Sequence, residues 1–269
     1  MPAPAPATHI PAEILLDRPG PGVARLTLNR AERKNAMTYA MWDGLGAAVE
    51  ALSEEPELRA IVLAGAGGVF CAGADISEFA EVRGDPEAAR RYERAVNRAN
   101  LSLRDSPKAV FAAVSGPAMG GGCGLALCCD FRVADRTAYF GIPAAKLSIV
   151  YSVTETRALL EAVGPARARE VLFTARRYPA EDALKIGMAT SLVDGDATEA
   201  ALEAAAELAG SAPLTIGGAK AVLGALGPRV SDADLARVLA WQDRAAASED
   251  YREGQAAFRE RRAPVFRGR

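Results

Sequence analysis

The sequence predicts an α/β fold with a largely parallel sheet, followed by a helical C-terminal section. Short strands that are apolar throughout alternate with helical segments over the first part of the chain, as in sheets covered by helices on both faces. From about residue 179 the pattern becomes mainly helical, with one short strand at 189–194. We therefore divide the 269 residues into a disordered Ala-Pro tail at 1–10, a core at 11–205 and a helical section at 206–269.

The core is predicted to open with a hairpin and a helix. EILLD and GVARLTLN alternate on either side of RPGPG, a turn sequence, and predict two paired strands. Thr38 then serves as the N-cap of a helix to about Ser53, because apolar residues recur along one face of that segment.

Two further strands, RAIVLAG and AVFAAV, share one layout, in which a glycine-rich loop follows the strand. The first loop, AGAGGVFCAGAD, precedes a polar helix at 86–105. The second loop, SGPAMGGG, runs directly into a helix predicted to begin near Cys123, and DFRVAD then forms the next strand. The core thus carries two glycine-rich loops at corresponding places.

The helical section is predicted to be part of the same domain, because its Ala-rich helices expose too little apolar area to fold alone. Trp241 and Phe258 are expected to pack against the main body or against another subunit. The predicted helices of the C-terminal part are EDALKIG, TEAALEAAAELAG, LTIGGAKAVLGAL, DADLARVLAWQDRAAAS and DYREGQAAFRERR.

Charge and hydropathy exclude two classes of partner. The net charge is −2, with acidic and basic residues spread along the chain, so no field is present that would collect nucleic acid or acidic lipid. No apolar run approaches the ~20 residues needed to cross a bilayer. The N-terminus lacks the features of a signal peptide, and we expect a cytoplasmic protein.

The cysteines and the single histidine restrict the chemistry. Cys71, Cys123, Cys128 and Cys129 have neither a disulfide pattern nor a zinc spacing, and we expect buried, reduced thiols. His9 lies in the tail, which removes Ser-His, Cys-His and multi-histidine metal mechanisms. No metal site is predicted, and any reaction must use carboxylates, Tyr, Ser or the backbone.

The two glycine-rich loops are candidates for binding an oxyanion. In the first, the amide of Ala74 is free to point outward, and in the second, Gly120, Gly121 and Gly122 precede a helix whose N-terminus has unsatisfied N–H donors. Glycines let a ligand approach such amides closely. If the loops converge, they form an oxyanion hole for an acyl thioester. The alternative is that the glycines serve only tight packing. Neither loop has the ending of a P-loop or the spacing of a dinucleotide fingerprint.

Five segments, in order, resemble the enoyl-CoA hydratase/isomerase (crotonase) superfamily and cover nearly everything after residue 11. The resemblance implies a crotonase-like spiral of ββα repeats with a C-terminal helical trimerisation section, and a homotrimer or hexamer. It also implies acyl-CoA chemistry of the kind found in fatty acid metabolism, with coenzyme A as part of the substrate and no separate cofactor. The segments are LTLNRAERKNAMT, IVLAGAGGVFCAGADISEF, SPKAVFAAVSGPAMGGGCGLALCCDFRVAD, AVGPARAREVLFTARRYPAEDALKIGMATSLV and EDYREGQAAFRERRAPVF.

The resemblance assigns roles to particular residues. It gives the oxyanion role to the amides of Ala74 and Gly121, and it places RKNAM along the CoA. The carboxylate of Asp75 is expected to fix its loop. The resemblance also places Lys34, Ala36, Ala72 and Ile76 near the adenine or the phosphates of the CoA. The full set of predicted substrate-binding positions is Lys34, Ala36, Ala72, Asp75, Ile76, Gly120, Gly124, Ala144 and Tyr151.

Two departures from the family pattern bear on the reaction. Hydratases of the family use two glutamates to add water, and here Gly124 and Ala144 stand at those positions, so ordinary hydration is not expected. The loop Tyr151-Ser-Val-Thr-Glu155 is also unusual. Glu155 is either a single acid/base that reaches the acyl pocket or a first-turn helix acid, and Tyr151 is either a proton donor or a pocket wall.

Two functions therefore stay open. The first is enolate chemistry, either double-bond isomerisation or a lyase step, with Ala74, Gly121 and Glu155 as the catalytic groups. The second is a catalytically silent acyl-CoA-binding protein or partner subunit.

Overall fold

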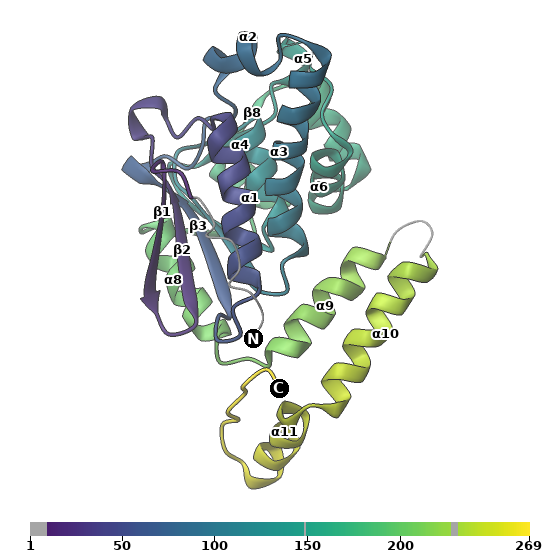
Figure 1. The fold of residues 1–269 in the computed structure, drawn as a ribbon. Coiled ribbons are helices and arrows are strands. Elements are labelled where there is room, and N and C mark those ends of the chain that lie inside the picture. The colour runs from purple at the N-terminus through teal and green to yellow at the C-terminus, as the bar shows by residue number, and fades with distance from the viewer. Residues whose placement is uncertain (1–9, 148, 227–230) are drawn as a thin grey trace.

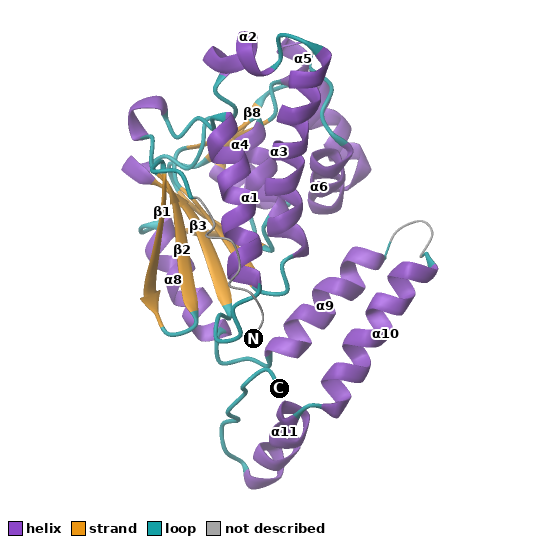
Figure 2. Ribbon diagram, in the orientation of Figure 1, coloured by secondary structure: helices purple, strands orange, loops and turns teal. Residues whose placement is uncertain are grey.

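The fold is shown in Figures 1 and 2 as a computed structural model that describes residues 10–147, 149–226 and 231–269. Nearly all of the predicted disordered tail, including His9, lies outside the described residues, as does the side chain of Phe258. The described chain forms a body with two sheets and a group of C-terminal helices that extends from it (Figure 1).

The main sheet has six strands in the order β1-β2-β3-β4-β6-β9. β1 and β2 form the predicted antiparallel hairpin, and every later neighbour is parallel. β3 and β4 are the two apolar strands predicted to be buried, and the side chains of β4 are buried along its whole length. The strands are β1 (Ile14–Gly20), β2 (Val23–Leu28), β3 (Ala60–Gly65), β4 (Ala109–Val114), β6 (Phe131–Asp135) and β9 (Ser191–Val193).

A second, three-stranded sheet consists of β5 (Pro117–Met119), β7 (Tyr139–Gly141) and β8 (Arg177–Pro179). β4 leads into β5, and β6 leads into β7, so successive turns of the chain add one strand to each sheet before a helix follows. The earlier turns add single parallel bridges in place of short strands, Met37 with Ala74 and Cys71 with Ala118. The chain is therefore a spiral of strand, short strand and helix, as expected.

Helices cover both faces of the main sheet. α1 (Tyr39–Ser53) and α3 (Pro86–Asp105) lie side by side on one face, and α8 (Ala197–Leu208) covers the other (Figure 1). The small side chains of α8 allow close packing on β3 and β4, which gives a second core cluster separate from the larger one. α8 continues past the predicted boundary at 205/206, and the chain leaves the sheet only after Leu208.

The predicted helix starts follow from capping. The hydroxyl of Thr38 accepts a hydrogen bond from the amide of Met41 at 3.2 Å, and α1 ends at Ser53 as predicted. Asp85 caps α3 by accepting hydrogen bonds from two amides of its first turn. Local side-chain chemistry therefore fixes both starts.

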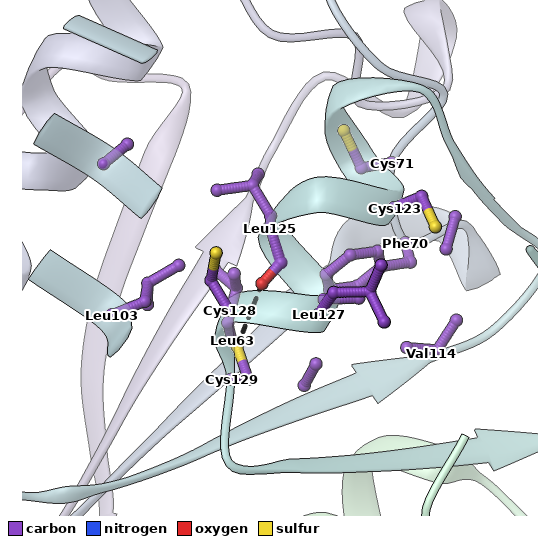
Figure 3. Close-up of a cluster of buried hydrophobic side chains, with 14 of the residues drawn as sticks. Leu63, Phe70, Cys71, Leu103, Val114, Cys123, Leu125, Leu127, Cys128 and Cys129 are labelled. Atoms are coloured by element: carbon purple, nitrogen blue, oxygen red, sulfur yellow. Dashed lines mark hydrogen bonds between the residues drawn. The ribbon is translucent and has the colours of Figure 1, made fainter. Parts of the chain in front are cut away.

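α4 (Gly121–Cys128) begins two residues earlier than predicted. The reason is Gly120, whose φ of 56° turns the chain directly from β5 into the helix. Figure 3 shows α4 among buried apolar side chains, with its cysteines directed into the core and Cys129 Sγ donating to the Leu125 carbonyl at 3.3 Å. All four cysteines are free and buried, which confirms the prediction.

The remaining helices of the body connect the sheets. α6 carries a break at Gly164, whose φ of 72° interrupts the helix immediately before Pro165. The helices concerned are α2 (Phe79–Val82), α5 (Ala144–Leu147), α6 (Val153–Thr174) and α7 (Ala180–Ile186).

No helix in the described ranges is long and apolar enough to cross a membrane.

The C-terminal section is an arm of three helices, α9 (Pro213–Ala225), α10 (Asp232–Ala247) and α11 (Glu249–Glu260). α9 and α10 run side by side away from the body (Figure 1), and the ring of Trp241 lies over the backbone of Gly217. Lys220 attaches α9 to the body, because its Nζ lies 2.6 Å from a carboxylate oxygen of Asp130.

Candidate active site

A cavity of about 560 Å³ lies where the two glycine-rich loops meet α2, α3 and the segment that leads into α6. Both predicted loops contribute to its wall, which also contains aromatic rings and several charged side chains. The lining residues are Arg33, Ala36, Trp42, Ala72, Gly73, Ala74, Asp75, Ile76, Phe79, Arg83, Ala89, Tyr92, Glu93, Val96, Gly120, Gly121, Pro143, Ala144, Leu147, Ile149, Val150, Tyr151, Ser152 and Glu155.

The amides of Ala74 and Gly121 converge at this cavity. Met37 donates to the Gly73 carbonyl and accepts from the Asp75 amide, both at 2.8 Å, so the Ala74 amide between them points the other way. The Gly121 amide belongs to the first turn of α4, which has no intrahelical acceptor for it. A Cβ on Gly121 would lie 3.8 Å from Ala74 N. Neither amide donates to a protein acceptor within the described ranges, so both are available to one ligand oxygen.

The close approach of the two loops requires glycine. Gly73 has a φ of 107°, and a Cβ there would lie 2.8 Å from the Met119 carbonyl oxygen and 3.5 Å from Gly121 N. Gly120, which precedes α4, also has a positive φ, 56°. A side chain at Gly73 would therefore push the loops apart as well as strain the backbone.

Backbone hydrogen bonds hold the first loop. Cys71 N donates to the Pro117 carbonyl at 2.8 Å, and Ala72 N donates to the Lys34 carbonyl at 2.9 Å. Asp75 accepts from Ser77 and pairs with Arg30 at 3.0 Å. The hydrogen bonds from Ser77, together with the Arg30 charge, hold the pKa of Asp75 below its ordinary value. The Asp75 carboxylate is thus ionised, and its contacts with Ser77 and Arg30 fix the loop.

Glu155 places its carboxylate inside the cavity. It belongs to the first turn of α6, where Ser152 accepts from its amide at 3.2 Å and donates to its Oε2 at 3.0 Å. Only 7% of the residue is exposed, and burial raises the pKa of its carboxyl group. A Cβ on Gly124 would lie 2.7 Å from Glu155 Oε1. The Glu155 carboxylate therefore occupies the space beside Gly124.

Two tyrosines in the wall keep their protons. Burial raises the pKa of Tyr151, whose hydroxyl lies 3.5 Å from the position of a Cβ on Gly120. Burial also raises the pKa of Tyr92 to about 12, and its hydroxyl accepts from Trp42 Nε1 at 3.1 Å. Tyr151 therefore stands next to the oxyanion loop as a neutral phenol that can donate a hydrogen bond.

Most of the predicted site residues meet in this one cavity. Two do not line it: Lys34 contributes its carbonyl to the loop, and Gly124 lies beneath Glu155. Within the described ranges, no group of three His, Cys, Asp or Glu side chains could hold a metal ion.

The wall of the cavity that α2 and α3 form, opposite the loops predicted from the sequence, was not predicted. Phe79, Arg83 and Tyr92 line it together with Trp42. The aromatic and apolar residues of the polar helix at 86–105 share one face, and this pattern was the available signal.

Comparisons with known proteins identify the family of this chain. A family model described as enoyl-CoA hydratase/isomerase matches residues 19–269. The probable enoyl-CoA hydratase echA6 of Mycobacterium leprae is 38% identical over 259 residues, covering 92% of this chain and 96% of the relative. The 2,3-dehydroadipyl-CoA hydratase of Escherichia coli is 34% identical, with 92% and 96% covered. The solved structure of an enoyl-CoA hydratase/carnithine racemase from Magnetospirillum magneticum has a TM-score of 0.87 at 37% identity, with 96% of each chain covered.

Proposed function

Because this chain belongs to the enoyl-CoA hydratase/isomerase family and has its crotonase-type fold, we propose that its cavity binds a CoA thioester through the thioester oxygen. The observation that carries the proposal is the pair of convergent amides Ala74 N and Gly121 N, which have no acceptor among the residues that the structure describes. Charge that develops on the oxygen during enolate formation would be met by both donors and by the N-terminus of α4. Loss of one such donor typically costs ~2.7–4 kcal/mol of transition-state stabilisation.

The proposed reaction is enolate chemistry with Glu155 as the single acid/base. Glu155 removes a proton from the α-carbon, and the C–H electron pair moves toward the thioester oxygen. For a β,γ-unsaturated acyl group, return of the same proton to the γ-carbon moves the double bond and completes an isomerisation. The raised pKa of Glu155 supports this role, because a general acid/base works best when its pKa lies near the working pH. A related lyase step would use the same enolate.

Ordinary hydration is not part of the proposal, although the relatives above are named as hydratases. Water addition needs one group to activate the water and another to exchange a proton with the α-carbon. Gly124 and Ala144 have no carboxylate, and Glu155 fills the space beside Gly124. One carboxyl group would have to serve both steps.

The alternative function is a catalytically silent acyl-CoA-binding protein or partner subunit. The observation that favours it is the second role of Glu155, whose amide and carboxylate both bond to the N-cap Ser152. This interaction resembles a capping arrangement and would give Glu155 a structural reason to be present without any reaction.

Deuterium exchange separates the two functions. We expect the wild-type protein to exchange α- or γ-protons of a bound acyl-CoA with D₂O, faster as rising pH ionises Glu155, with mass spectrometry as the readout. Glu155→Gln should abolish the exchange while calorimetry still detects binding, because the amide keeps the size and loses the basicity. Glu170→Gln, the same change at a half-buried residue of the same helix that does not line the cavity, is the matched control. Wild-type protein that binds but never exchanges would establish the silent binder.

The loop before α1 supports recognition of the CoA nucleotide. Lys34 and Asn35 both adopt a φ of 53°, and Asn35 locks the turn by accepting from Arg30 N at 2.9 Å and donating to Ala66 O at 3.0 Å. Arg33 and Lys34 are exposed in this turn, the Lys34 carbonyl accepts from the Ala72 amide, and Arg33 lines the cavity together with Ala72. We infer that the side chains of Arg33 and Lys34 bind the CoA phosphates, with Ala36 and Ile76 beside the adenine.

The assembly is proposed to be a homotrimer or a hexamer. Support comes from a depression between α6 and the end of α9 that apolar side chains line. Val150 is 93% exposed, Val153 84% and Phe173 73%, which is unusual for neighbouring apolar residues. A second copy of the chain would cover them. The four reduced cysteines support a reducing compartment, and the cytoplasm stays our proposed location.

A further inference from the structure

The wall of the cavity formed by α2 and α3 carries Arg83, whose contacts among the described residues are with aromatic rings. The guanidinium carbon of Arg83 lies 4.5 Å from the ring centre of Phe79 and 4.7 Å from that of Tyr92. All three residues line the cavity. In the described part of the chain, this guanidinium forms no salt bridge and no hydrogen bond to a side chain, and its charge acts on Glu155 only at longer range, where it partly offsets the effect of burial on the pKa of that carboxyl group. Its contacts with the two rings leave its N–H donors free.

A continuous series of contacts leads from the oxyanion loops to Arg83. A Cβ on Gly121 would lie 3.0 Å from the ring of Trp42, and the indole nitrogen of Trp42 donates to the Tyr92 hydroxyl at 3.1 Å. Arg83 lies over the ring of Tyr92. Two aromatic side chains therefore separate the guanidinium from the site proposed for the thioester carbonyl. An acyl chain that follows this wall ends near Arg83.

We propose that Arg83 binds a carboxylate at the distal end of the acyl chain, so that the substrate class is a dicarboxylic acid with one end joined to CoA. This inference rests on the proposed function, because the thioester end must occupy the oxyanion loops. The planar guanidinium offers a fork of donors that matches a carboxylate, and such charge-assisted hydrogen bonds are stronger than neutral ones. An acyl chain that ends in a methyl group would leave these donors facing only solvent.

The acidic side chains of the cavity favour a different ligand, an acyl chain with a cationic tail. Glu93 and Glu155 also line the cavity, and together with the aromatic rings they would suit a cationic tail such as trimethylammonium. Arg83 already lies over the faces of Phe79 and Tyr92, however, so a cationic tail would meet a like charge at the same rings. An anionic tail meets an opposite charge there and is favoured.

Calorimetry with pairs of acyl-CoAs of equal length tests the proposal. The pairs are succinyl- and butyryl-CoA, adipyl- and hexanoyl-CoA, and suberyl- and octanoyl-CoA, with 4-trimethylammoniobutyryl-CoA as the cationic probe. For at least one pair we expect the carboxylate ligand to bind about tenfold more tightly at low salt, which corresponds to about 1.4 kcal/mol. Added salt should reduce the ratio, because the site is open to solvent.

Variants assign the preference to one side chain. Arg83→Gln should bring the ratio of the two affinities to about one, and Arg83→Lys should give an intermediate ratio, because it keeps the charge and loses the fork. Arg91→Gln makes the same charge change in α3, at an exposed residue that pairs with Glu87, and should keep the wild-type ratio. Circular dichroism before each titration checks that the variants are folded.

The outcomes separate this inference from the proposed function. Equal affinities within every pair, a preference that survives in Arg83→Gln, or tightest binding of the cationic probe would each overturn the role of Arg83 while leaving thioester binding intact. Failure of both members of every pair to bind would overturn the proposed function, and the role of Arg83 with it.

Discussion

At the scale of single residues, Glu155 combines two roles that the sequence presents as alternatives. Its backbone belongs to the first turn of α6 and bonds to Ser152, as a helix-start acid would. Its carboxylate nevertheless lies in the cavity against Gly124. A glutamate whose only role is to complement the helix dipole would extend into solvent, where the interaction is worth ~0.3–1 kcal/mol. Burial makes Glu155 costly to ionise instead.

This cost predicts how stability depends on pH. Burial raises the folded-state pKa of Glu155 above its unfolded value of about 4.3, so the folded protein binds more protons between the two values. The free energy of unfolding should therefore fall as pH rises through this window. Glu155→Gln should flatten that part of the curve and be the more stable protein at neutral pH. Urea unfolding from pH 4 to 8 checks this. Burial also raises the pKa of Asp130, so the difference between the two proteins isolates Glu155.

Gly124 should tolerate no side chain while Glu155 is present. A Cβ there would lie 2.7 Å from Oε1 and 3.4 Å from Cδ of Glu155, so Gly124→Ala should destabilise the protein by ~1–3 kcal/mol. Adding Glu155→Ala should recover part of this loss, a non-additivity that a double-mutant cycle in urea measures. Gly218→Ala in α9 is the control, because its new Cβ meets only ordinary contact at 3.6 Å. Strict additivity of the two changes would contradict the predicted contact.

At the scale of elements, the site depends on how two loops end. β5 passes directly into α4 through Gly120, and the loop after β3 approaches that junction through Gly73. Each loop presents one amide, and only their convergence gives a pair. The glycines therefore set the distance between two elements as well as the local turn.

Gly73→Ala should weaken acyl-CoA binding and lower stability together. The new Cβ would lie 2.8 Å from the Met119 carbonyl oxygen at a φ of 107°. Gly68→Ala is the matched control, because Gly68 also has a positive φ, 69°, and a Cβ there would meet nothing within 4 Å. We expect the control to lose only the ~1–2 kcal/mol of a left-handed residue, with unchanged affinity. Equal affinities for the two variants in calorimetry would show that the loop spacing does not matter for binding.

At the scale of the whole molecule, the C-terminal arm and the exposed side of α6 leave apolar surface uncovered. α9 and α10 extend from the body (Figure 1), and Leu226 at the end of α9 lines the same depression as Val153 and Phe173. A contiguous patch of this kind is typical of a protein–protein interface. Repeated copies that close around it would bury the patch and fix the direction of the arm.

Phe173→Glu should therefore lower the oligomeric state. Sedimentation analysis should find a trimer or hexamer for the wild-type protein and smaller species for the variant, because an uncompensated buried charge opposes the interface. Leu15→Glu, at an apolar side chain of β1 that is 48% exposed and outside the patch, is the control and should assemble normally. A monomeric wild-type protein would refute the assembly.

The sequence by itself determined the features that depend on neighbouring residues. The helix cap at Thr38, the polar helix at 86–105, the apolar strands and the glycine-rich loops follow from side-chain chemistry within a few positions. The resemblance to the family implied the spiral fold and assigned the oxyanion role to the amides of Ala74 and Gly121. The early start of α4 was not predicted, because it depends on the φ of Gly120.

Only the tertiary structure decided which distant residues meet. Glu155 lies against Gly124, and Arg83 lies over the ring of Tyr92 at the end of the same wall. These contacts join α6 to α4 and α2 to α3, and no local pattern encodes them. They follow from the close packing of the helices on the sheet. This packing places the Glu155 carboxylate in the space beside Gly124 and the Arg83 guanidinium over the ring of Tyr92.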